Sequence, residues 1–236
     1  MIWTISDIHG CWDAYQELLA EIAPGRHDTL YILGDATDRG PASMRVLLDI
    51  IRRPGTVYIP GNHDYFLRRL GPCCGLSPEE GGRRKTLFDA VLKTAWMHDG
   101  GRETLAQFRA LPAAVRREIL TYFESAPAFV QVNAGGADWV LTHKPVNGFE
   151  RKPFWRDWGL PDYLRPAVPY TRPYFTDSRI ILSGHTLTAT LRPDGASSVY
   201  TGNGHIVIDC GCAFGGRLGA FCLDTGETVY VHGHTP

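Results

Sequence analysis

The sequence predicts an α/β fold, which is supported by the order of its segments and by its composition. Short apolar runs alternate with amphipathic stretches through the first third of the 236-residue chain, as in parallel strands covered by helices. Hydrophobic residues make up 44% of the chain and charged residues 21%, as in ordinary globular enzymes. The formal net charge of -1 gives no reason to expect binding to nucleic acid or to an anionic membrane.

The first third is predicted to contain three strands and three helices in strict alternation. Short apolar runs mark the strands, and apolar residues three and four apart mark the helices. The strands are Ile2–Ser6, Thr29–Leu33 and Thr56–Ile59, and the helices are Trp12–Ile22, Ala42–Ile51 and Asp64–Leu70. This order predicts parallel pairing of the three strands.

The stretch from about residue 79 to residue 125 has helical periodicity throughout, and we expect a helical cap inserted into a single domain that spans residues 1–236. Strands return after it, at Ala128–Val132, Asp138–Thr142, Arg179–Ser183, His205–Asp209, Ala220–Leu223 and Thr228–His232. The aromatic and proline-rich loop Lys144–Asp177 lies among them. Loops of this length in compact domains are usually functional or disordered, and the aromatic residues argue against disorder.

Five polar clusters follow predicted strands. They are SDIHG, GDATDRG, GNHD, THK and SGHT. Open α/β sheets bind their ligands beyond the carboxyl ends of the strands. The clusters supply Asp, Asn and His without a thiolate, a donor set that suits Mn, Fe or Zn better than Ca or a structural zinc. Each cluster alone could cap a turn, but together they predict a metal site.

The five clusters, in this order, resemble the signature series of the calcineurin-like metallophosphoesterases. The DRG ending resembles the branch that contains Ser/Thr phosphoprotein phosphatases, phage-type phosphatases and bacterial diadenosine tetraphosphatases. The resemblance extends from Asp7 to His185. It implies a β-sandwich of mixed sheets flanked by helices, with the cap inserted. It also implies phosphate ester hydrolysis by a hydroxide that bridges two metal ions about 3.5–4 Å apart.

The resemblance implies a role for most polar residues of the clusters. The metal ligands would be Asp7 and His9 at one ion, Asp35 between both ions, and Asn62, His143 and His185 at the other. A carboxylate can bridge two cations, and an Asn carbonyl oxygen adds a ligand without adding charge. Mn is the expected metal, with Fe or Zn as alternatives.

His63 would protonate the leaving alkoxide, and Asp38 would orient its ring. Arg39 matches the phosphate-binding arginine of the family, whose planar fork suits phosphate oxygens. The candidates for a second phosphate-binding arginine are Arg156, in FWRDW, and its alternatives Arg151 and Arg172.

Two features depart from the family pattern or bear on substrate choice. Asp64 stands where the family usually has Glu, and we do not count it as a ligand. The stretch WMHDGGRETLAQF resembles the NGG-x-x-TL turn of bacterial diadenosine tetraphosphatases and their phosphatase relatives. Because it falls in the expected cap, substrate choice is expected to depend on it. His98, in the same stretch, is interpreted as a cap or core histidine.

The leading functional prediction is a phosphatase for phosphate monoesters, either in phosphoserine or phosphothreonine proteins or in small molecules. The alternative is a dinucleoside polyphosphate hydrolase. A nuclease is disfavoured because Leu187 stands where the GHxH motif has its second histidine. A metal-binding scaffold without turnover is disfavoured because every motif position is filled. Phosphorylated protein or small-molecule substrates are the expected partners, with neither nucleic acid nor membrane among them.

Two further expectations concern the chain ends and the cell compartment. GHT occurs at His185 and again at His234, and only His185 is expected to bind metal, because it follows a strand and completes the series. The N-terminus lacks the basic and apolar regions of a signal peptide. With six cysteines and no CxxC pair, reduced thiols and a cytoplasmic location are expected.

Overall fold

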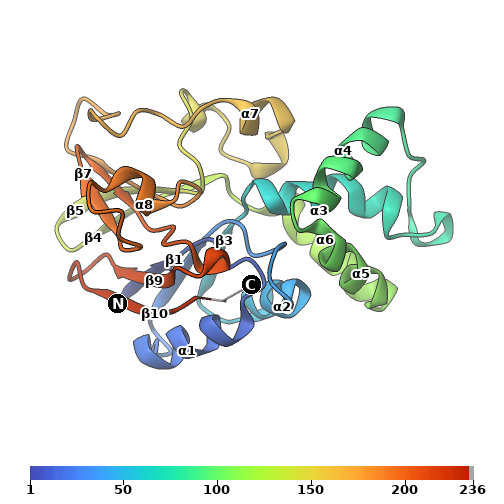
Figure 1. The fold of residues 1–236 in the computed structure, drawn as a ribbon, viewed down its shortest axis with the longest axis horizontal. Coiled ribbons are helices and arrows are strands. Elements are labelled where there is room, and N and C mark those ends of the chain that lie inside the picture. Colours follow the sequence, from blue (N-terminus) through green and yellow to red (C-terminus); the bar gives the residue numbers. More distant parts are fainter. Residues whose placement is uncertain (234–236) are drawn as a thin grey trace.

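The computed structural model describes residues 1–233, and within that range two five-stranded sheets form the centre of the molecule (Figure 1). The first sheet has the order β10-β9-β1-β2-β3, and the second has the order β4-β5-β6-β8-β7. The strands of the first sheet are β1 (Ile2–Ile5), β2 (Thr29–Leu33), β3 (Thr56–Ile59), β9 (Arg217–Cys222) and β10 (Thr228–His232). Those of the second sheet are β4 (Phe129–Ala134), β5 (Ala137–Thr142), β6 (Ile180–Ser183), β7 (Tyr200–Gly202) and β8 (His205–Val207).

Helices surround the two sheets. They are α1 (Trp12–Ile22), α2 (Ser43–Arg52), α3 (Asn62–Cys74), α4 (Leu87–His98), α5 (Gly101–Ala110), α6 (Ala113–Ser125), α7 (Leu160–Leu164) and α8 (Thr188–Leu191). The short 3-10 turns are η1 (Pro78–Glu80), η2 (Phe149–Arg151), η3 (Trp155–Asp157) and η4 (Cys212–Phe214). None of the helices in residues 1–233 combines the length and the apolar character needed to cross a bilayer.

The predicted parallel pairing of the first three strands is confirmed. β1 pairs in parallel with β2, and β2 with β3. β9 and β10 extend this sheet in antiparallel fashion, and the second sheet is also mixed, because β5, β6 and β8 run parallel between antiparallel edge strands. The fold is therefore the predicted α/β sandwich of mixed sheets flanked by helices.

Side chains that alternate along the strands separate two hydrophobic cores. Leu33 and Leu141 belong to the cluster that joins the two sheets. Their neighbours Ile32 and Val140 point the other way and pack into the larger cluster beneath the helices and loops. The helices α1 and α2 cover the first sheet, and the aromatic loop that contains α7 lies along the second (Figure 1).

The structure differs from the sequence prediction in the length of α3. The helix runs from Asn62 to Cys74, longer at both ends than predicted, and Pro72 lies inside it. The Asp64 carboxylate accepts a hydrogen bond of 2.8 Å from the Gly61 amide, which caps the helix two residues earlier than expected. The three-residue strand β7 and the short helices within residues 144–177 were not predicted, because such short segments show too little periodicity.

The helices α4, α5 and α6 occupy the span predicted for the insertion and form a lobe beside the two sheets, shown in green in Figure 1. They pack on one another and on α2 and α3. The assignment of this lobe as a cap stays a prediction.

A buried carboxylate holds the start of this lobe together. Asp89 accepts hydrogen bonds of 2.6 and 3.0 Å from the Arg83 guanidinium, and Arg69 approaches the same carboxylate at 3.0 Å. Asp89 also caps α4 by accepting a 2.9 Å bond from the Thr86 amide. The Arg83 guanidinium lowers the pKa of Asp89 below its usual value.

The variant Asp89→Asn is expected to lower the free energy of unfolding by about 1–3 kcal/mol at pH 7, because hydrogen bonds to an ionised group are lost. Since the folded-state pKa lies below the unfolded-state value of about 3.9, the carboxylate stabilises the fold above that pH. Its contribution disappears as the pH falls through the folded-state pKa. Denaturant unfolding at pH 7 and pH 3 should therefore show a gap between wild type and variant that narrows in acid; a gap of constant size would contradict this.

Candidate dinuclear metal site

Polar side chains that follow five strands meet at one edge of the sandwich. β1, β2 and β3 provide them from the first sheet, and β5 and β6 from the second. Parallel strands end on the same side of a sheet, so residues far apart in sequence are brought together there. The fully buried members are Asp7, His9, Asp35, His63 and His143. Asn62 and His185 are partly exposed.

The backbone at this edge is held in an unusual conformation. Six of the eight non-glycine residues with positive φ in the described chain lie in the polar clusters, with φ between 49° and 73°. They are Asp7, His9, Asp35, Asp38, Arg39 and His185. Positive φ is uncommon for residues other than glycine and collects at functional sites, where surrounding contacts hold it in place.

Two glycines leave the space that the polar side chains need. A Cβ atom at Gly34 would lie 2.2 Å from Nδ1 of His143, and one at Gly61 would lie 2.1 Å from Oδ1 of Asp35. Neither clash could be relieved without moving a buried polar side chain. The glycines that flank the sequence motifs are thus explained by close packing against neighbouring motif residues.

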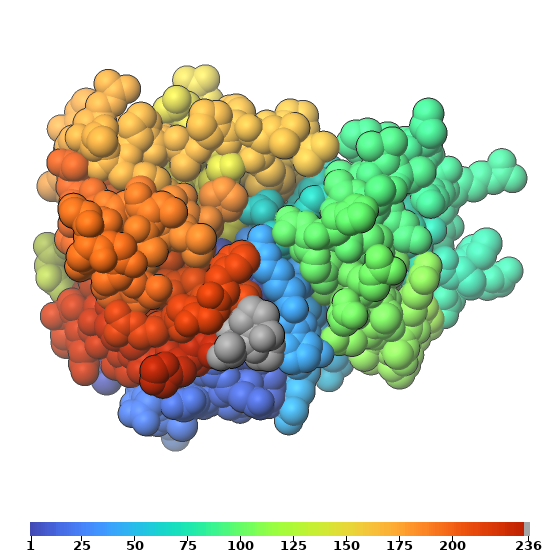
Figure 2. Space-filling model, viewed as in Figure 1, coloured from blue at the N-terminus to red at the C-terminus, as the bar shows by residue number. Residues whose placement is uncertain are grey.

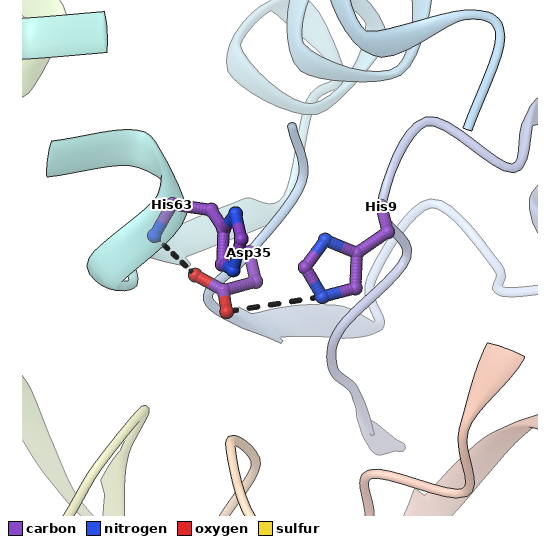
Figure 3. Close-up of side chains that lie close together, drawn as sticks. All are labelled: His9, Asp35 and His63. Carbon is purple, nitrogen blue, oxygen red and sulfur yellow. Dashed lines mark hydrogen bonds and ion pairs between the residues drawn. The ribbon is translucent and has the colours of Figure 1, made fainter. Parts of the chain in front are cut away.

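Asp35 lies at the centre of the site. Figure 3 shows its carboxylate beside the imidazoles of His9 and His63. Its Oδ2 atom is 3.9 Å from Nε2 of His9 and 3.5 Å from Nε2 of His143. Two groups of ligand atoms, each within 4.8 Å of one another, share this residue: His9, Asp35 and His63 form one, and Asp35, His143 and His185 form the other. One carboxylate shared by two groups is the arrangement that a bridging ligand requires.

His143 and Asn62 bring two polar atoms together at the second group. Nδ1 of His143 donates a 2.9 Å hydrogen bond to the Leu33 carbonyl, and burial lowers the pKa of His143 to about 3. Its Nε2 is therefore unprotonated at neutral pH, yet it lies 2.9 Å from the Asn62 amide oxygen. Two acceptors at this distance repel each other unless a cation lies beside both. Burial also lowers the pKa of His185 to about 2, which leaves that imidazole neutral.

His9 is oriented in the same way at the first group. Its Nδ1 donates a 2.8 Å hydrogen bond to the Thr37 carbonyl, and burial lowers its pKa well below the usual value. Its Nε2 lone pair therefore points toward Asp35 and accepts a hydrogen bond from the Arg39 guanidinium. A backbone carbonyl on the far ring nitrogen is a common way to fix the tautomer of a metal-binding histidine.

Asp7 lies between the two sheets rather than inside either group of convergent atoms found in residues 1–233. Its Oδ2 atom accepts a 3.0 Å hydrogen bond from the His185 amide. Burial and the neighbouring Asp209 carboxylate raise the pKa of Asp7 well above its usual value. Burial also raises the pKa of Asp209 to about 6. A cation beside two buried carboxylates that repel each other would stabilise both.

Asp209 was missed by the sequence analysis, although a signal was present. It follows β8 in the stretch IDCG, which is a sixth polar cluster after a strand, with a glycine nearby. It accepts a 3.0 Å hydrogen bond from the Gly211 amide.

Asp64 holds the loop that carries the central carboxylate. It is fully buried and accepts hydrogen bonds from the Asp35 amide at 3.0 Å, the Thr37 hydroxyl at 3.1 Å and the Tyr58 hydroxyl. Both of its oxygens are occupied by these groups and by the Gly61 amide. Its contacts are those of a residue that positions the site, in keeping with its omission from the predicted ligands.

His63 and Asp38 form a buried pair beside the first group. Nδ1 of His63 donates a 2.8 Å hydrogen bond to Oδ2 of Asp38, and this oxygen also accepts a 2.8 Å bond from the Trp96 indole of α4. The Asp38 amide donates a 3.1 Å bond to the Thr104 hydroxyl of α5. The inserted helices thus fix the carboxylate that orients His63, and the His63 side chain lies with those of His9 and Asp35.

Arg39 and Asp99 lie where the inserted helices meet the site. The Arg39 amide donates to the Gly100 carbonyl at 3.4 Å, and its guanidinium donates a 3.2 Å bond to Oδ1 of Asp99. Oδ2 of Asp99 is 3.6 Å from Nε2 of His63. Asp99 was not among the predicted residues; it begins the DGG triplet of the turn that was expected to influence substrate choice.

One predicted site residue has no contact with this cluster in the described part of the chain. Arg156 donates a 3.0 Å hydrogen bond to the Glu124 carbonyl and packs on the Phe154 ring, and within residues 1–233 neither contact reaches the Asp35 group. Its role in phosphate binding stays a prediction, as do those of its alternatives. His234, which was expected not to bind metal, lies outside the described residues.

Because Arg39 is the predicted phosphate-binding arginine, Asp99→Asn is expected to strengthen inhibition by orthophosphate by up to about fivefold, since the exposed carboxylate would no longer compete for the guanidinium. Asp177→Asn is the matched control: Asp177 forms a comparably exposed ion pair with Arg179, with side-chain exposures of 53% for Asp177 and 51% for Asp99. The inhibition constant of orthophosphate against p-nitrophenyl phosphate hydrolysis measures the effect. Equal changes in both variants would show that Asp99 does not restrict Arg39.

Sequence comparisons place the whole chain among known phosphoesterases. The family model of calcineurin-like phosphoesterases matches residues 1–236. A symmetrical bis(5'-nucleosyl)-tetraphosphatase of Neisseria gonorrhoeae is 29% identical over 272 aligned residues, covering 97% of this chain and 94% of the relative. An asymmetrical bis(5'-nucleosyl)-tetraphosphatase of Geobacillus sp. is 27% identical, covering 98% and 94%.

Solved structures show the same fold. A putative diadenosine tetraphosphatase aligns with a TM-score of 0.60 at 19% identity, covering all of this chain and 94% of the other. A protein serine/threonine phosphatase from Saccharomyces cerevisiae aligns with a TM-score of 0.58 at 14% identity, covering 100% and 80%. The chain therefore belongs to the calcineurin-like phosphoesterase family and is a hydrolase of phosphoesters.

Proposed function

We propose that the polar side chains around Asp35 hold two metal ions, with Mn as the first candidate. Asp7, His9 and Asp35 would hold one ion, and Asn62, His143 and His185 would complete the other with Asp35. The neutral histidines and the facing acceptor atoms fit cations of this kind. The bound ions would supply an activated water and neutralise charge on the phosphate.

The side chains around the ions have separate tasks in the proposed reaction. Arg39 orients the phosphate through its planar guanidinium. His63 donates a proton from Nε2 to the leaving oxygen, and Asp38 keeps the ring in the required tautomer through the 2.8 Å hydrogen bond at Nδ1. Both residues are buried, so bulk water has little access to the hydrogen bond between them.

We further propose that the substrates are dinucleoside polyphosphates. The relatives from Neisseria and Geobacillus are both named bis(5'-nucleosyl)-tetraphosphatases and align over nearly the whole chain, inserted helices included. This full-length similarity is the observation that supports the alternative of the sequence analysis over its leading prediction.

Phosphate monoester hydrolysis is the second candidate, and the His63–Asp38 pair favours it. An alkoxide is a poor leaving group and depends on a general acid, whereas a nucleotide leaves a phosphoanhydride without much help. Asp38, the buried carboxylate that contacts His63, would matter most in a monoesterase, because it supports the general acid.

The test compares kcat/KM of the Mn-loaded protein for diadenosine tetraphosphate, p-nitrophenyl phosphate and a phosphoserine peptide. The proposal expects at least about a tenfold preference for diadenosine tetraphosphate, the size of one modest binding contribution. A preference for either monoester would support the second candidate and contradict the first. Chromatography of the nucleotide products would show whether the cut is symmetrical or asymmetrical.

A further inference from the structure

An exposed aromatic ring lies next to the proposed phosphate-binding arginine. The Phe214 side chain is 57% exposed, and its ring centroid is 4.8 Å from Cζ of Arg39. Single exposed hydrophobic residues are common on protein surfaces. Phe214 is distinguished by its contact with Arg39, whose guanidinium also reaches His9. The proposed reaction gives Phe214 no role.

The turn that carries Phe214 is held in place by its own backbone and by the site. Phe214 ends η4, between Gly211 and Gly215, whose φ values are 77° and 76°. The Phe214 amide donates a 2.9 Å hydrogen bond to the Gly211 carbonyl, and the Gly211 amide donates to the buried Asp209. The ring is thus presented by an ordered turn that is tied to the metal site, and ordered platforms lose little entropy when they bind.

Arg39 connects the ring to the reaction centre. Its guanidinium donates to Nε2 of His9 and also lies over the Phe214 ring. A substrate phosphate bound by Arg39 would therefore lie close to the Phe214 ring. In Figure 2 the three parts of the chain involved, coloured red, light blue and green, meet on one face near the centre of the molecule.

We propose that Phe214 is the platform on which a nucleobase of the substrate stacks. The inference rests on the proposed nucleotide substrate, and it adds the residue that would recognise the base. Every nucleobase has a π face that stacks on an aromatic side chain, and the adjacent guanidinium attracts the phosphate joined to it. Asp99 is already engaged by Arg39 and lies near His63.

The chain contains a matched control for this pair. Phe154 is 45% exposed, and its ring centroid is 4.4 Å from Cζ of Arg156. Both pairs consist of an exposed phenyl ring and an arginine, but Arg156 contacts the Glu124 carbonyl on α6 rather than the metal ligands. Phe154→Ala therefore removes the same kind of contact beside an arginine that has no contact with the metal-ligand candidates in residues 1–233.

The experiment measures binding by calorimetry for the Mn-loaded wild type and for Phe214→Ala, Phe214→Trp and Phe154→Ala. The probes are ADP, inorganic pyrophosphate and phenyl phosphate. Phe214→Ala should weaken ADP binding by about 5- to 150-fold, the range of base–aromatic stacking, and leave pyrophosphate binding within about twofold. Phe214→Trp should restore ADP binding, and Phe154→Ala should change nothing.

Three results would overturn the proposal. Unchanged ADP binding in Phe214→Ala would show that no base stacks on Phe214. An equal loss of affinity for ADP and pyrophosphate would mean that Phe214 only positions Arg39. A loss confined to phenyl phosphate would identify an aryl ester site instead of a nucleobase site. If wild type binds ADP through Phe214 but fails to cleave diadenosine tetraphosphate, the platform stands and the proposed substrate class fails.

Discussion

Asp35→Ala is expected to lower the rate of phosphate hydrolysis by about a thousandfold or more, a larger loss than for any other single ligand. Metal ions contribute several kcal/mol to such reactions, and each 1.36 kcal/mol corresponds to a factor of ten. Asp35 takes part in both groups of ligand atoms, whereas Asp7 is outside them and His185 belongs to one. The measurement is kcat for p-nitrophenyl phosphate at saturating Mn, compared among wild type, Asp35→Ala and Asp7→Ala.

Asp7→Ala is the control for this variant. Asp7 is equally buried and also a carboxylate, so both variants remove a similar group from the same region. Asp35 additionally accepts a 2.9 Å hydrogen bond from the His63 amide, so thermal unfolding should be recorded for each variant. A folded Asp35→Ala protein with a rate equal to or above that of Asp7→Ala would contradict the bridging role.

His63→Ala is expected to lower the rate for alkyl phosphates by about 10²–10⁴, the usual contribution of a general acid, while metal content stays unchanged. The loss should shrink for aryl phosphates, because a phenolate needs less protonation than an alkoxide. Steady-state rates on glycerol phosphate and p-nitrophenyl phosphate, with metal analysis of the same samples, test both parts.

His63→Ala also distinguishes between two roles that the geometry allows for His63, metal ligand and general acid. His63 lies among ligand-type atoms with His9 and Asp35, and its Nδ1 donates to Asp38. Loss of metal from His63→Ala would make it a ligand. Asp38→Asn should reproduce the substrate dependence of His63→Ala in weaker form, because the ring keeps its place but loses its charged partner.

The central polar residues could be predicted from the sequence because the segments next to each residue determine its place after a strand. Asp7, Asp35 and Asn62 follow strands whose apolar runs are visible in the sequence, and glycines beside them permit the tight turns. Parallel pairing then places these turns together without any knowledge of the loops. The alternation of Ile32 and Leu33 between two cores follows from the strand period alone.

The residues that were missed depend on contacts between distant segments. Asp99 reaches Arg39 and His63 only because Gly100 packs on the Arg39 backbone across about sixty residues of chain, a contact that no local pattern encodes. Phe214 reaches Arg39 from the opposite end of the sequence. Local periodicity describes each element, but it does not specify how a helical insertion or a late turn is placed against the site.

The number of metal ions per chain tests the central assignment most directly. Mn titration followed by calorimetry, with elemental analysis of the purified complexes, should show two ions bound to wild type. Asp35→Ala should lower the occupancy of both metal sites, and His185→Ala should lower the occupancy of one. A wild-type protein that binds a single ion, or one that keeps full activity after metal removal, would contradict a dinuclear site centred on Asp35.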